Sequence, residues 1–283
     1  MEKATGHSRA GHDVSRAWLR FASPNPDAVG MKQTIIPNRP VMTRICPDRP
    51  PKAVRILLAS MDELTGRFAP VAPAHSCLSL VDLRLLAPLM TKADSADALN
   101  SLLSPAEIQL LAGFTYPKRR IEWLGGRLAA KYGLQRLLPD QAARWRDFSI
   151  LPDTHGRPRV QPPSHCTLTV PSVSISHSRD YAAALVSNAP LCGLDIQQKT
   201  PQLITVQERF AAEAELALLS SIPEQLTRLA LLWAVKEAVK KGCLADHPSF
   251  FGAIRLTTVH RVPDESSWTA LCQVTQASGR AVR

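Results

Sequence analysis

The stretch Trp233-Ala-Val-Lys-Glu-Ala-Val-Lys-Lys241 is the one around which this chain is organised, because on a helix it separates into two chemically different faces. The apolar face holds Leu231, Leu232, Val235, Ala238 and Val239, and the other face holds Trp233, Lys236, Glu237, Lys240 and Lys241. Taken alone, this is also the pattern of a solvated helix in which Glu237 and Lys241 form a pair worth about 0.2–0.5 kcal/mol. The rest of the sequence has to decide between the two interpretations.

Composition sets the broad class. The chain has 283 residues, enough for one large domain or two ordinary ones, and its 45% apolar and 20% charged residues are typical of a soluble globular protein. No apolar run reaches the ~18 residues of a membrane span, and no secretory signal is visible, so we expect a cytoplasmic protein without membrane association. The six cysteines are scattered without zinc spacing, and we interpret them as free, mostly buried thiols.

The net charge of +10 is unevenly distributed. Residues 1–60 hold ten Lys/Arg and four Asp/Glu, which leaves 24 basic and 20 acidic residues for 61–283. Within that larger part, basic residues cluster at 117–131 and 236–241 instead of coating a surface. Focused positive charge suits a phosphorylated small molecule or an acidic protein partner, and it argues against specific nucleic-acid binding.

Residues 1–72 form a Pro- and Arg-rich segment with no sustained hydrophobic period. We expect them to be an extended or disordered N-terminal extension in which Ala53–Ser60 is the only candidate element. From residue 73 onward, helical and strand-like patterns mix, which indicates an α/β protein. The predicted elements are a strand over 78–86, a helix from the capping pattern Ser104-Pro-Ala-Glu107, a long helix over 116–133, strands over 173–178, 181–187 and 191–197, helices over 207–219 and 221–241, and strands over 250–259 and 268–275.

Two of these elements carry candidate binding groups. On the long helix, Arg120 and Arg127 lie two turns apart, which suits either an anion clamp or a solvated face.

We expect 181–187 and 191–197 to form a hairpin around Asn188-Ala-Pro190, with Gly242 ending the last helix. In the second strand Asp195 and Gln197 share a face, while Cys192, Leu194 and Ile196 take the core face. Two such side chains would offer oxygen ligands to a divalent cation, although an aspartate there can also protect a sheet edge.

Five short motifs occur in a fixed order. They are Lys118-Arg-Arg…Gly-Gly-Arg127, His155-Gly-Arg-Pro158, Ser174-Ile-Ser-His-Ser178, Gly193-Leu-Asp-Ile-Gln197 and Trp233-x-x-Lys-Glu-Ala-x-x-Lys241. In this order the set resembles the 4′-phosphopantetheinyl transferases of the larger surfactin-synthetase-activating (Sfp) or enterobactin-synthetase-component-D type. The resemblance covers about residues 78–270, and its last three motifs are the more specific ones.

The resemblance implies an α/β (α+β) fold of two similar halves in one chain, related by a pseudo-twofold, over 73–187 and 188–283. It implies that coenzyme A lies between the halves and gives its phosphopantetheine arm to a serine of an acyl or peptidyl carrier protein, releasing 3′,5′-ADP. The carrier is expected to be acidic and the enzyme a monomer.

The resemblance also implies roles for individual residues. Asp195 and Glu237 would hold Mg²⁺ against the diphosphate, and Glu237 or a metal-bound water would accept the serine proton. Lys241 and Lys236 would stabilise the departing phosphate. The positions that match coenzyme A contacts are Arg120, Arg127, Arg157, Ser176 and His177.

The sequence departs from the family pattern at two site positions. Gln197 stands where the family often has a glutamate, and an amide is a poorer ligand for a hard cation. Arg157 stands where the family often has lysine, and the two cations grip phosphate with different geometry. Two alternatives stay open. One is a coenzyme A or carrier-binding module disabled at Gln197. The other, motivated by the basic charge and by Asp195 with Glu237 as ligands, is a metal-dependent nucleic-acid-binding protein.

Overall fold

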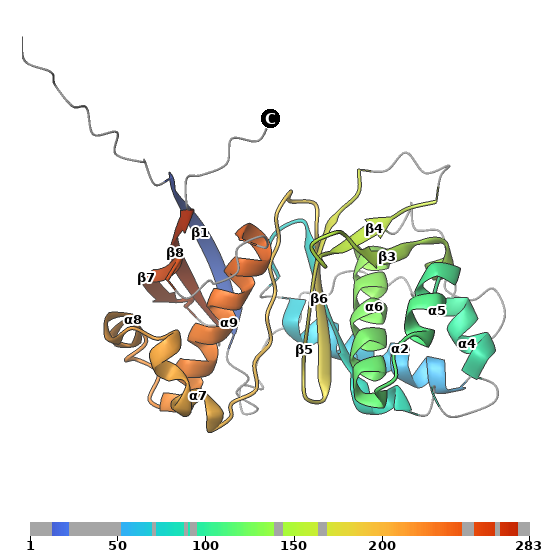
Figure 1. Cartoon of the computed structure of the whole chain (residues 1–283), viewed down its shortest axis with the longest axis horizontal. Helices are drawn as coiled ribbons and strands as arrows, with labels where there is room; N and C mark the ends of the chain where they lie inside the picture. Colours follow the sequence, from blue (N-terminus) through green and yellow to red (C-terminus); the bar gives the residue numbers. More distant parts are fainter. Residues whose placement is uncertain are drawn as a thin grey trace, which may run out of the picture.

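The apolar face of the stretch at 231–239 packs inward, and the helix that carries it is one of two long helices around which the chain folds. The computed structural model describes residues 13–22, 52–69, 72–87, 90, 95–138, 144–163, 169–244, 252–263 and 267–276. Within these ranges, each long helix packs on its own three-stranded antiparallel sheet, and the two units lie side by side (Figure 1). None of the helices in this part of the chain is long and apolar enough to cross a membrane.

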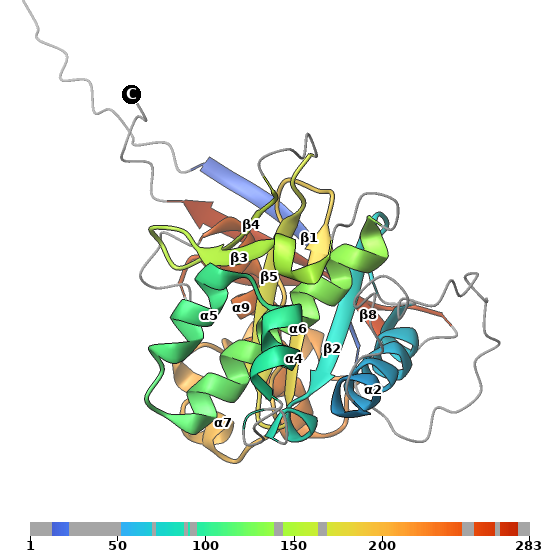
Figure 2. The same ribbon diagram turned by 90° about the vertical axis from the view of Figure 1, so that its right-hand side faces the viewer.

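The first unit is built on α6 (Pro117–Leu137), which packs on a sheet with strand order β2-β6-β5. Gly133 lets the helix approach closely, because a Cβ there would come within 2.7 Å of Val186 Cγ2. The other elements surround this pair, and Figure 2 shows the unit from its own side. They are β2 (Ser76–Asp82), β5 (Ser172–Ser178), β6 (Tyr181–Ser187), α2 (Lys52–Phe68), η2 (Leu83–Leu85), α4 (Ser95–Leu102), α5 (Pro105–Ala112), η3 (Trp145–Asp147), and the hairpin of β3 (Ser149–Pro152) and β4 (Pro158–Gln161).

The second unit is built on α9 (Gln225–Cys243), which packs on β1 (Asp13–Ala22) and β7 (Ile254–Arg261) of a sheet with order β1-β8-β7. Its remaining elements are β8 (Ser267–Gln276), α7 (Gln202–Thr205), η4 (Gln207–Arg209) and α8 (Glu213–Leu218). The two sheets share one topology. In each, the strand that comes last in the chain is central, and the long helix lies between the first and second strands in sequence.

A buried ion pair is also repeated in the two units. Lys131 of α6 lies 2.8 Å from Glu107 of α5, and Lys236 of α9 lies 2.7 Å from Glu215 of α8. Each glutamate accepts the backbone N–H of the residue three positions before it, from Ser104 in one unit and Ala212 in the other. The second carboxylate oxygen accepts a strand N–H, from Ile150 in the first unit and Leu256 in the second. A buried charge is tolerated when it is paired and hydrogen-bonded. Glu107 and Glu215 meet this condition through the same three kinds of partner, one in each unit.

The prediction of a disordered extension over 1–72 is wrong for two segments. Strand β1 pairs antiparallel with β8, and helix α2 contributes to the first hydrophobic core through Val54, Leu57, Leu58 and Met61. These four positions follow the i, i+3, i+4, i+7 spacing of an amphipathic helix, and α2 contains no proline. The Pro and Arg content of the flanking sequence hides this pattern. Residues 1–12, 23–51 and 70–71 lie outside the described ranges.

The predicted hairpin of 181–187 with 191–197 is also wrong. Strand β6 pairs with β5 and β2, whereas 191–200, the connector between the two units, forms no strand. Its backbone N–H groups bond to serine hydroxyls of β5 instead of to a backbone ladder. As a result, Cys192, Leu194 and Ile196 are half-buried and do not enter the core as predicted.

Most other element predictions are confirmed, with shifted ends. The capping box at Ser104, the long helix α6, the β5 and β6 strands and the two final strands are all present. The predicted 78–86 strand ends at Asp82, whose side chain accepts from the N–H of Arg84 and starts a 3-10 turn. The predicted 207–219 helix is split into η4 and α8, and α9 starts at Gln225 and continues past Gly242 to Cys243.

The expectation of free thiols is confirmed for the four cysteines in the described ranges, whereas Cys46 and Cys166 lie outside them. Cys272 is buried, and Cys77, Cys192 and Cys243 are half-buried. Burial raises the pKa of Cys77 and of Cys192 to about 11, so both thiols are protonated near neutral pH.

Candidate active site

The connector and α9 are in direct backbone contact, and this contact brings the two halves of the site together. A Cβ on Gly193 would lie only 1.8 Å from the carbonyl oxygen of Ala238, so the connector can lie this close only because residue 193 is glycine. Ala238 directly follows Glu237 on the helix, and Asp195 lies two residues beyond Gly193. The contact therefore places the predicted carboxylates of two separate elements beside each other.

Asp195 is held in place by two donors. Its Oδ1 accepts a hydrogen bond from Lys241 Nζ at 2.7 Å and another from Ser176 Oγ at 2.8 Å. Lys241 also donates to the carbonyl oxygen of Leu194 at 3.0 Å. The Asp195 side chain is 9% exposed and that of Lys241 is 31% exposed, so the pair is partly screened from water while the ammonium stays accessible.

Glu237 has an environment suited to accepting a proton. Burial raises the pKa of its carboxyl group, the positive charge of Lys240 opposes the rise, and the negative charge of Asp195 adds to it. A carboxylate with a raised pKa is a stronger base than an ordinary surface glutamate.

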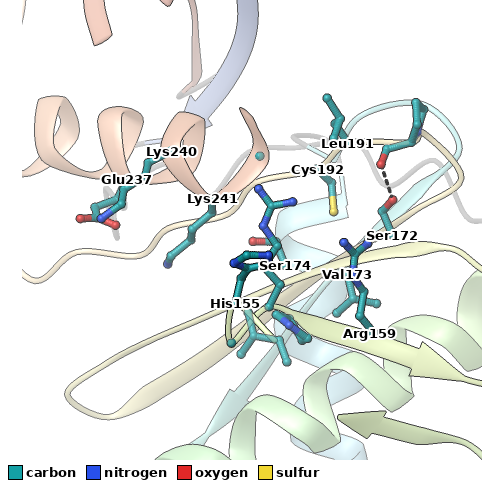
Figure 3. A pocket seen from close by; sticks show the side chains of 16 residues that line it. His155, Arg159, Ser172, Val173, Ser174, Leu191, Cys192, Glu237, Lys240 and Lys241 are labelled. Atoms are coloured by element: carbon teal, nitrogen blue, oxygen red, sulfur yellow. Dashed lines mark hydrogen bonds between the residues drawn. The ribbon is translucent and has the colours of Figure 1, made fainter. Parts of the chain in front are cut away.

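A cavity of about 340 Å³ opens beside these groups. In Figure 3, α9 contributes Glu237, Lys240 and Lys241 from one side, while His155 and Arg159 come from the β3–β4 hairpin on the other. The other lining residues are Gly156, Arg157, Pro158, Ser172, Val173, Ser174, Ile175, Pro190, Leu191, Cys192 and Gly242. Four Lys or Arg side chains converge on a space that contains one carboxylate, so this cavity favours an anion such as a phosphate group.

Arg157 lies where the sequence places it, in the wall of the cavity. Its Nε is buried and has no hydrogen-bond partner among the described residues, so it has unused donor capacity. The sequence motifs assign no role to Arg159 or His155. His155 lies in the turn before β4 and Arg159 lies on β4, so no regular spacing in the sequence groups them with Arg157.

Lys236 does not belong to the site, and its predicted catalytic role is wrong. Its ammonium is 2% exposed and donates to Glu215 and to the carbonyl oxygen of Phe210, both at 2.7 Å. Helical spacing correctly put Lys236 beside Glu237, but it could not show that α8 covers this flank of α9. Lys236 holds the second unit together instead of contacting a ligand.

Replacing Lys236 with alanine is expected to lower the free energy of unfolding by about 3 kcal/mol or more, because it leaves Glu215 as a buried unpaired charge. Urea denaturation followed by circular dichroism measures this loss. The matched control is Lys199→Ala, which breaks the exposed Lys199–Glu224 pair (2.8 Å) and should cost no more than about 1 kcal/mol. Equal stability of the two variants would contradict a structural role for Lys236.

The predicted anion clamp of Arg120 and Arg127 does not face the cavity. Arg127 is 9% exposed, donates from Nε to the carbonyl oxygen of Ile150 at 3.0 Å, and stacks 4.5 Å above the ring of Trp123. Burial lowers its pKa to about 10. The Nε of Arg120 is buried without a hydrogen-bond partner in the described structure, and neither arginine lines the cavity. Arg127 is therefore a structural residue of the first unit.

Ser176 and His177 lie beside the site but outside the cavity lining. The Ser176 hydroxyl is bonded to Asp195, so it is not directed at the cavity as a phosphate contact would be. His177 Nε2 lies 3.3 Å from Arg119 Nη1, and its Nδ1 lies 3.7 Å from Glu122 Oε1. Burial is the main cause that lowers the pKa of His177, which keeps its ring neutral near pH 7.

The two carboxylates fit a hard divalent cation that shares its coordination with a ligand. No group of three or more His, Cys, Asp and Glu side chains gathers at a metal-binding distance within the described ranges. Mg²⁺, however, is commonly bound by only one or two carboxylates together with substrate phosphates and water. Asp195 and Glu237 supply that number beside the anion-favouring cavity. Gln197 donates from Nε2 to the carbonyl oxygen of Gln198 at 3.1 Å, and this bond does not involve the amide oxygen, which is the atom that could bind a cation.

Comparison with known proteins assigns the family. No family model matches the chain. The holo-[acyl-carrier-protein] synthase of Geobacillus sp. (strain WCH70) is 32% identical over 113 residues, which cover 38% of this chain and 90% of that protein. The synthase of Acholeplasma laidlawii (strain PG-8A) is 33% identical over 89 residues, which cover 31% of this chain and 75% of that protein.

Solved structures of the same class also match. The Helicobacter pylori holo-[acyl-carrier-protein] synthase in complex with coenzyme A matches with a TM-score of 0.34 and 21% identity, over 40% of this chain and 97% of that chain. The Bacillus anthracis str. Ames synthase in complex with CoA (3',5'-ADP) matches with a TM-score of 0.34 and 20% identity, over 39% of this chain and 91% of that chain. Because two curated sequences above 30% identity are matched over most of their length, this chain belongs to the holo-[acyl-carrier-protein] synthase family.

Proposed function

We propose that this protein transfers the 4′-phosphopantetheine group of coenzyme A to a serine of an apo carrier protein, giving the holo-carrier and 3′,5′-ADP. The observation that carries the proposal is the juxtaposition of Glu237, Asp195 and Lys241 beside a basic cavity, in a chain that belongs to the holo-[acyl-carrier-protein] synthase family. Coenzyme A carries a diphosphate and a 3′-phosphate, and the cavity offers several cations to such groups.

Coenzyme A binding would use the cations of the cavity wall. Arg157 and Arg159 come from the β3–β4 hairpin, and Lys240 and Lys241 come from the end of α9, so the phosphates would be gripped from both units at once. The unpartnered Nε of Arg157 supports its role as a phosphate donor. Arg127 and Lys236 are hydrogen-bonded inside their own units and take no direct part in this binding, whereas Arg120 stays a predicted coenzyme A contact.

The reaction would proceed by displacement at phosphorus. The carrier serine oxygen forms a bond to the β-phosphorus of coenzyme A, and the bond from that phosphorus to the oxygen it shares with the adenylate portion breaks. Glu237 accepts the serine proton, and Lys241 stabilises the negative charge that develops on the leaving phosphate. Bound Mg²⁺, held by Asp195 and Glu237, would supply charge neutralisation at the diphosphate. Gln197 would offer only a neutral amide oxygen, which is a poorer ligand for Mg²⁺ than a carboxylate.

We also propose that the chain is of the larger type, with two similar halves in one polypeptide related by a pseudo-twofold. The shared sheet order and the repeated buried Lys–Glu pair support this arrangement. The curated relatives match only about a third of the chain, which leaves room for a second unit. The halves would be 73–187 and 188–283, with α2 joining the first and β1 the second. A monomeric state, a cytoplasmic location and an acidic carrier stay predictions.

Intact-mass spectrometry of apo carrier proteins tests the function. The full chain is incubated with coenzyme A, Mg²⁺ and carriers from fatty-acid, polyketide and peptide synthesis. We expect at least one carrier to gain a single phosphopantetheine group, with one 3′,5′-ADP released for each group. If coenzyme A binds but no carrier gains mass, the chain is a disabled binding module. Strong, steeply salt-dependent DNA binding without transfer would favour the nucleic-acid alternative.

A further inference from the structure

Three serines of β5 anchor the connector to the first unit. They lie at alternate positions, so their side chains point to one side of the strand. Their hydroxyl oxygens accept the backbone N–H groups of the connector in steps of two, along a parallel course: Ser174 from Leu194 at 2.9 Å, Ser176 from Ile196 at 3.2 Å, and Ser178 from Gln198 at 3.0 Å. We call these three bonds the serine ladder.

Ser176 makes one bond that distinguishes it from the other two serines. It is 5% exposed, and its Oγ donates to Asp195 Oδ1 at 2.8 Å. A serine hydroxyl has one hydrogen to donate and lone pairs to accept with. The Ser176 oxygen uses a lone pair to accept from the N–H of Ile196, so the hydroxyl hydrogen is available to donate to the Asp195 carboxylate. The ladder thus fixes the backbone around residue 195, and of the three serines Ser176 is the one that also bonds to the Asp195 side chain.

Two donors meet at the same oxygen of Asp195. Lys241 Nζ lies 2.7 Å from Oδ1, the atom that also accepts from Ser176. These are the bonds that the described structure gives the carboxylate, so Oδ2 is the oxygen left to bind another group. The torsion that turns a carboxylate is soft, and one donor alone would fix it poorly. Lys241 approaches from α9 and Ser176 from β5, so together they hold the carboxylate from both units.

We propose that Ser176 is a positioning residue that orients Asp195 toward a divalent cation, and not a contact of coenzyme A. This inference rests on the proposed function, in which Asp195 and Glu237 hold Mg²⁺. Without the Ser176 hydroxyl, Asp195 is free to turn and close onto Lys241, so that it offers the cation a poorer ligand. Outer partners of metal ligands typically contribute about 10–100-fold to metal affinity, and we expect a loss near the lower limit.

The test measures metal binding directly. Mn²⁺ is titrated into the full chain in the presence of 3′,5′-ADP, and free Mn²⁺ is followed by electron paramagnetic resonance. We expect Ser176→Ala to weaken Mn²⁺ binding about tenfold. Ser178→Ala is the matched control, because it removes a ladder bond without touching Asp195, and we expect less than about a twofold change. Ser176→Thr, which keeps the hydroxyl, should restore binding.

A double-mutant cycle separates positioning from general damage. In an Asp195→Asn background, adding Ser176→Ala should cause no further loss of Mn²⁺ affinity, because the serine acts through the carboxylate. If Ser176→Ala does not fold, Ser176→Cys replaces it, since a thiol is a similar size but a weak donor.

The outcomes separate the two proposals. Equal Mn²⁺ affinity in the wild type, Ser176→Ala and Ser178→Ala would overturn the positioning role, even if the wild type modifies carriers. Equal losses in Ser176→Ala and Ser178→Ala would also overturn it, because the ladder alone would then explain the effect. A wild type that binds Mn²⁺ with the expected pattern but transfers nothing would sink the proposed function and leave the positioning role standing.

Discussion

Replacement of Glu237 by glutamine is expected to reduce phosphopantetheine transfer by about 10²–10⁴-fold, the usual contribution of a positioned general base. Glutamine keeps the size and shape of the side chain but cannot accept the serine proton and is a weaker cation ligand. Burial raises the pKa of the Glu237 carboxyl, so the native group has the greater basicity that the step needs. Rates of carrier modification, followed by intact mass, measure the loss.

The control for Glu237 is Glu208→Gln, which removes an exposed carboxylate of the same unit away from the cavity. We expect this variant to transfer at the wild-type rate, and thermal unfolding should show both variants folded. If Glu237→Gln kept more than about a tenth of the activity, the proton would have to go to another acceptor. A metal-bound water would then be the next candidate.

The central residues of the site could be predicted from the sequence because each lies in a short motif on one element. Glu237 and Lys241 lie one turn apart on a helix, and Asp195 lies two residues after a glycine. Such spacings depend on local geometry alone. The contact that joins the motifs cannot be predicted in this way, because no short stretch of sequence indicates that Gly193 contacts the carbonyl group of Ala238.

The wrong predictions come from packing between distant segments. Helical periodicity places Lys236 on the polar face of α9, but α8 covers that flank and provides Glu215 as a buried partner. Arg127 is likewise covered, because β3 supplies the carbonyl of Ile150. A polar residue on a helix can face solvent, a ligand or a buried counter-charge, and its own helix does not distinguish these cases.

The fold shows the same limit. Strand β1 completes the second sheet by pairing with β8, which begins more than two hundred residues later in the chain. Pairing at this distance leaves no pattern in a local window, so the local sequence predicts only an extension for the N-terminal region. The alternating residues of the connector predict a strand, yet its N–H groups bond to serine side chains. Alternation predicts an extended chain correctly but does not say what it pairs with.

Substitution of Gly193 by alanine is the second change with a large expected effect, and it acts on geometry instead of chemistry. The new Cβ would lie 1.8 Å from the Ala238 carbonyl oxygen and 2.8 Å from its carbonyl carbon, and neither backbone atom can move without shifting α9. Overpacking of this kind typically costs about 1–3 kcal/mol of unfolding free energy. Relief of the clash would move Glu237 and Lys241 away from Asp195, and a displacement of about 1 Å can reduce a reaction about 10²-fold. Chemical denaturation and the rate of carrier modification measure the two effects.

Gly242 provides the matched comparison because it lies on the helix side of the same contact. A Cβ there would be 3.5 Å from Cys192, an ordinary van der Waals distance. Gly242→Ala should therefore leave stability unchanged or raise it by up to about 1 kcal/mol, the usual gain from replacing glycine inside a helix. Since both substitutions add one methyl group to one interface, a stability loss confined to Gly193→Ala would locate the constraint at the Ala238 carbonyl. If Gly193→Ala were as stable and active as the wild type, the connector could move freely, and the approach of Asp195 to α9 would have to be set by the serine ladder and Lys241 alone.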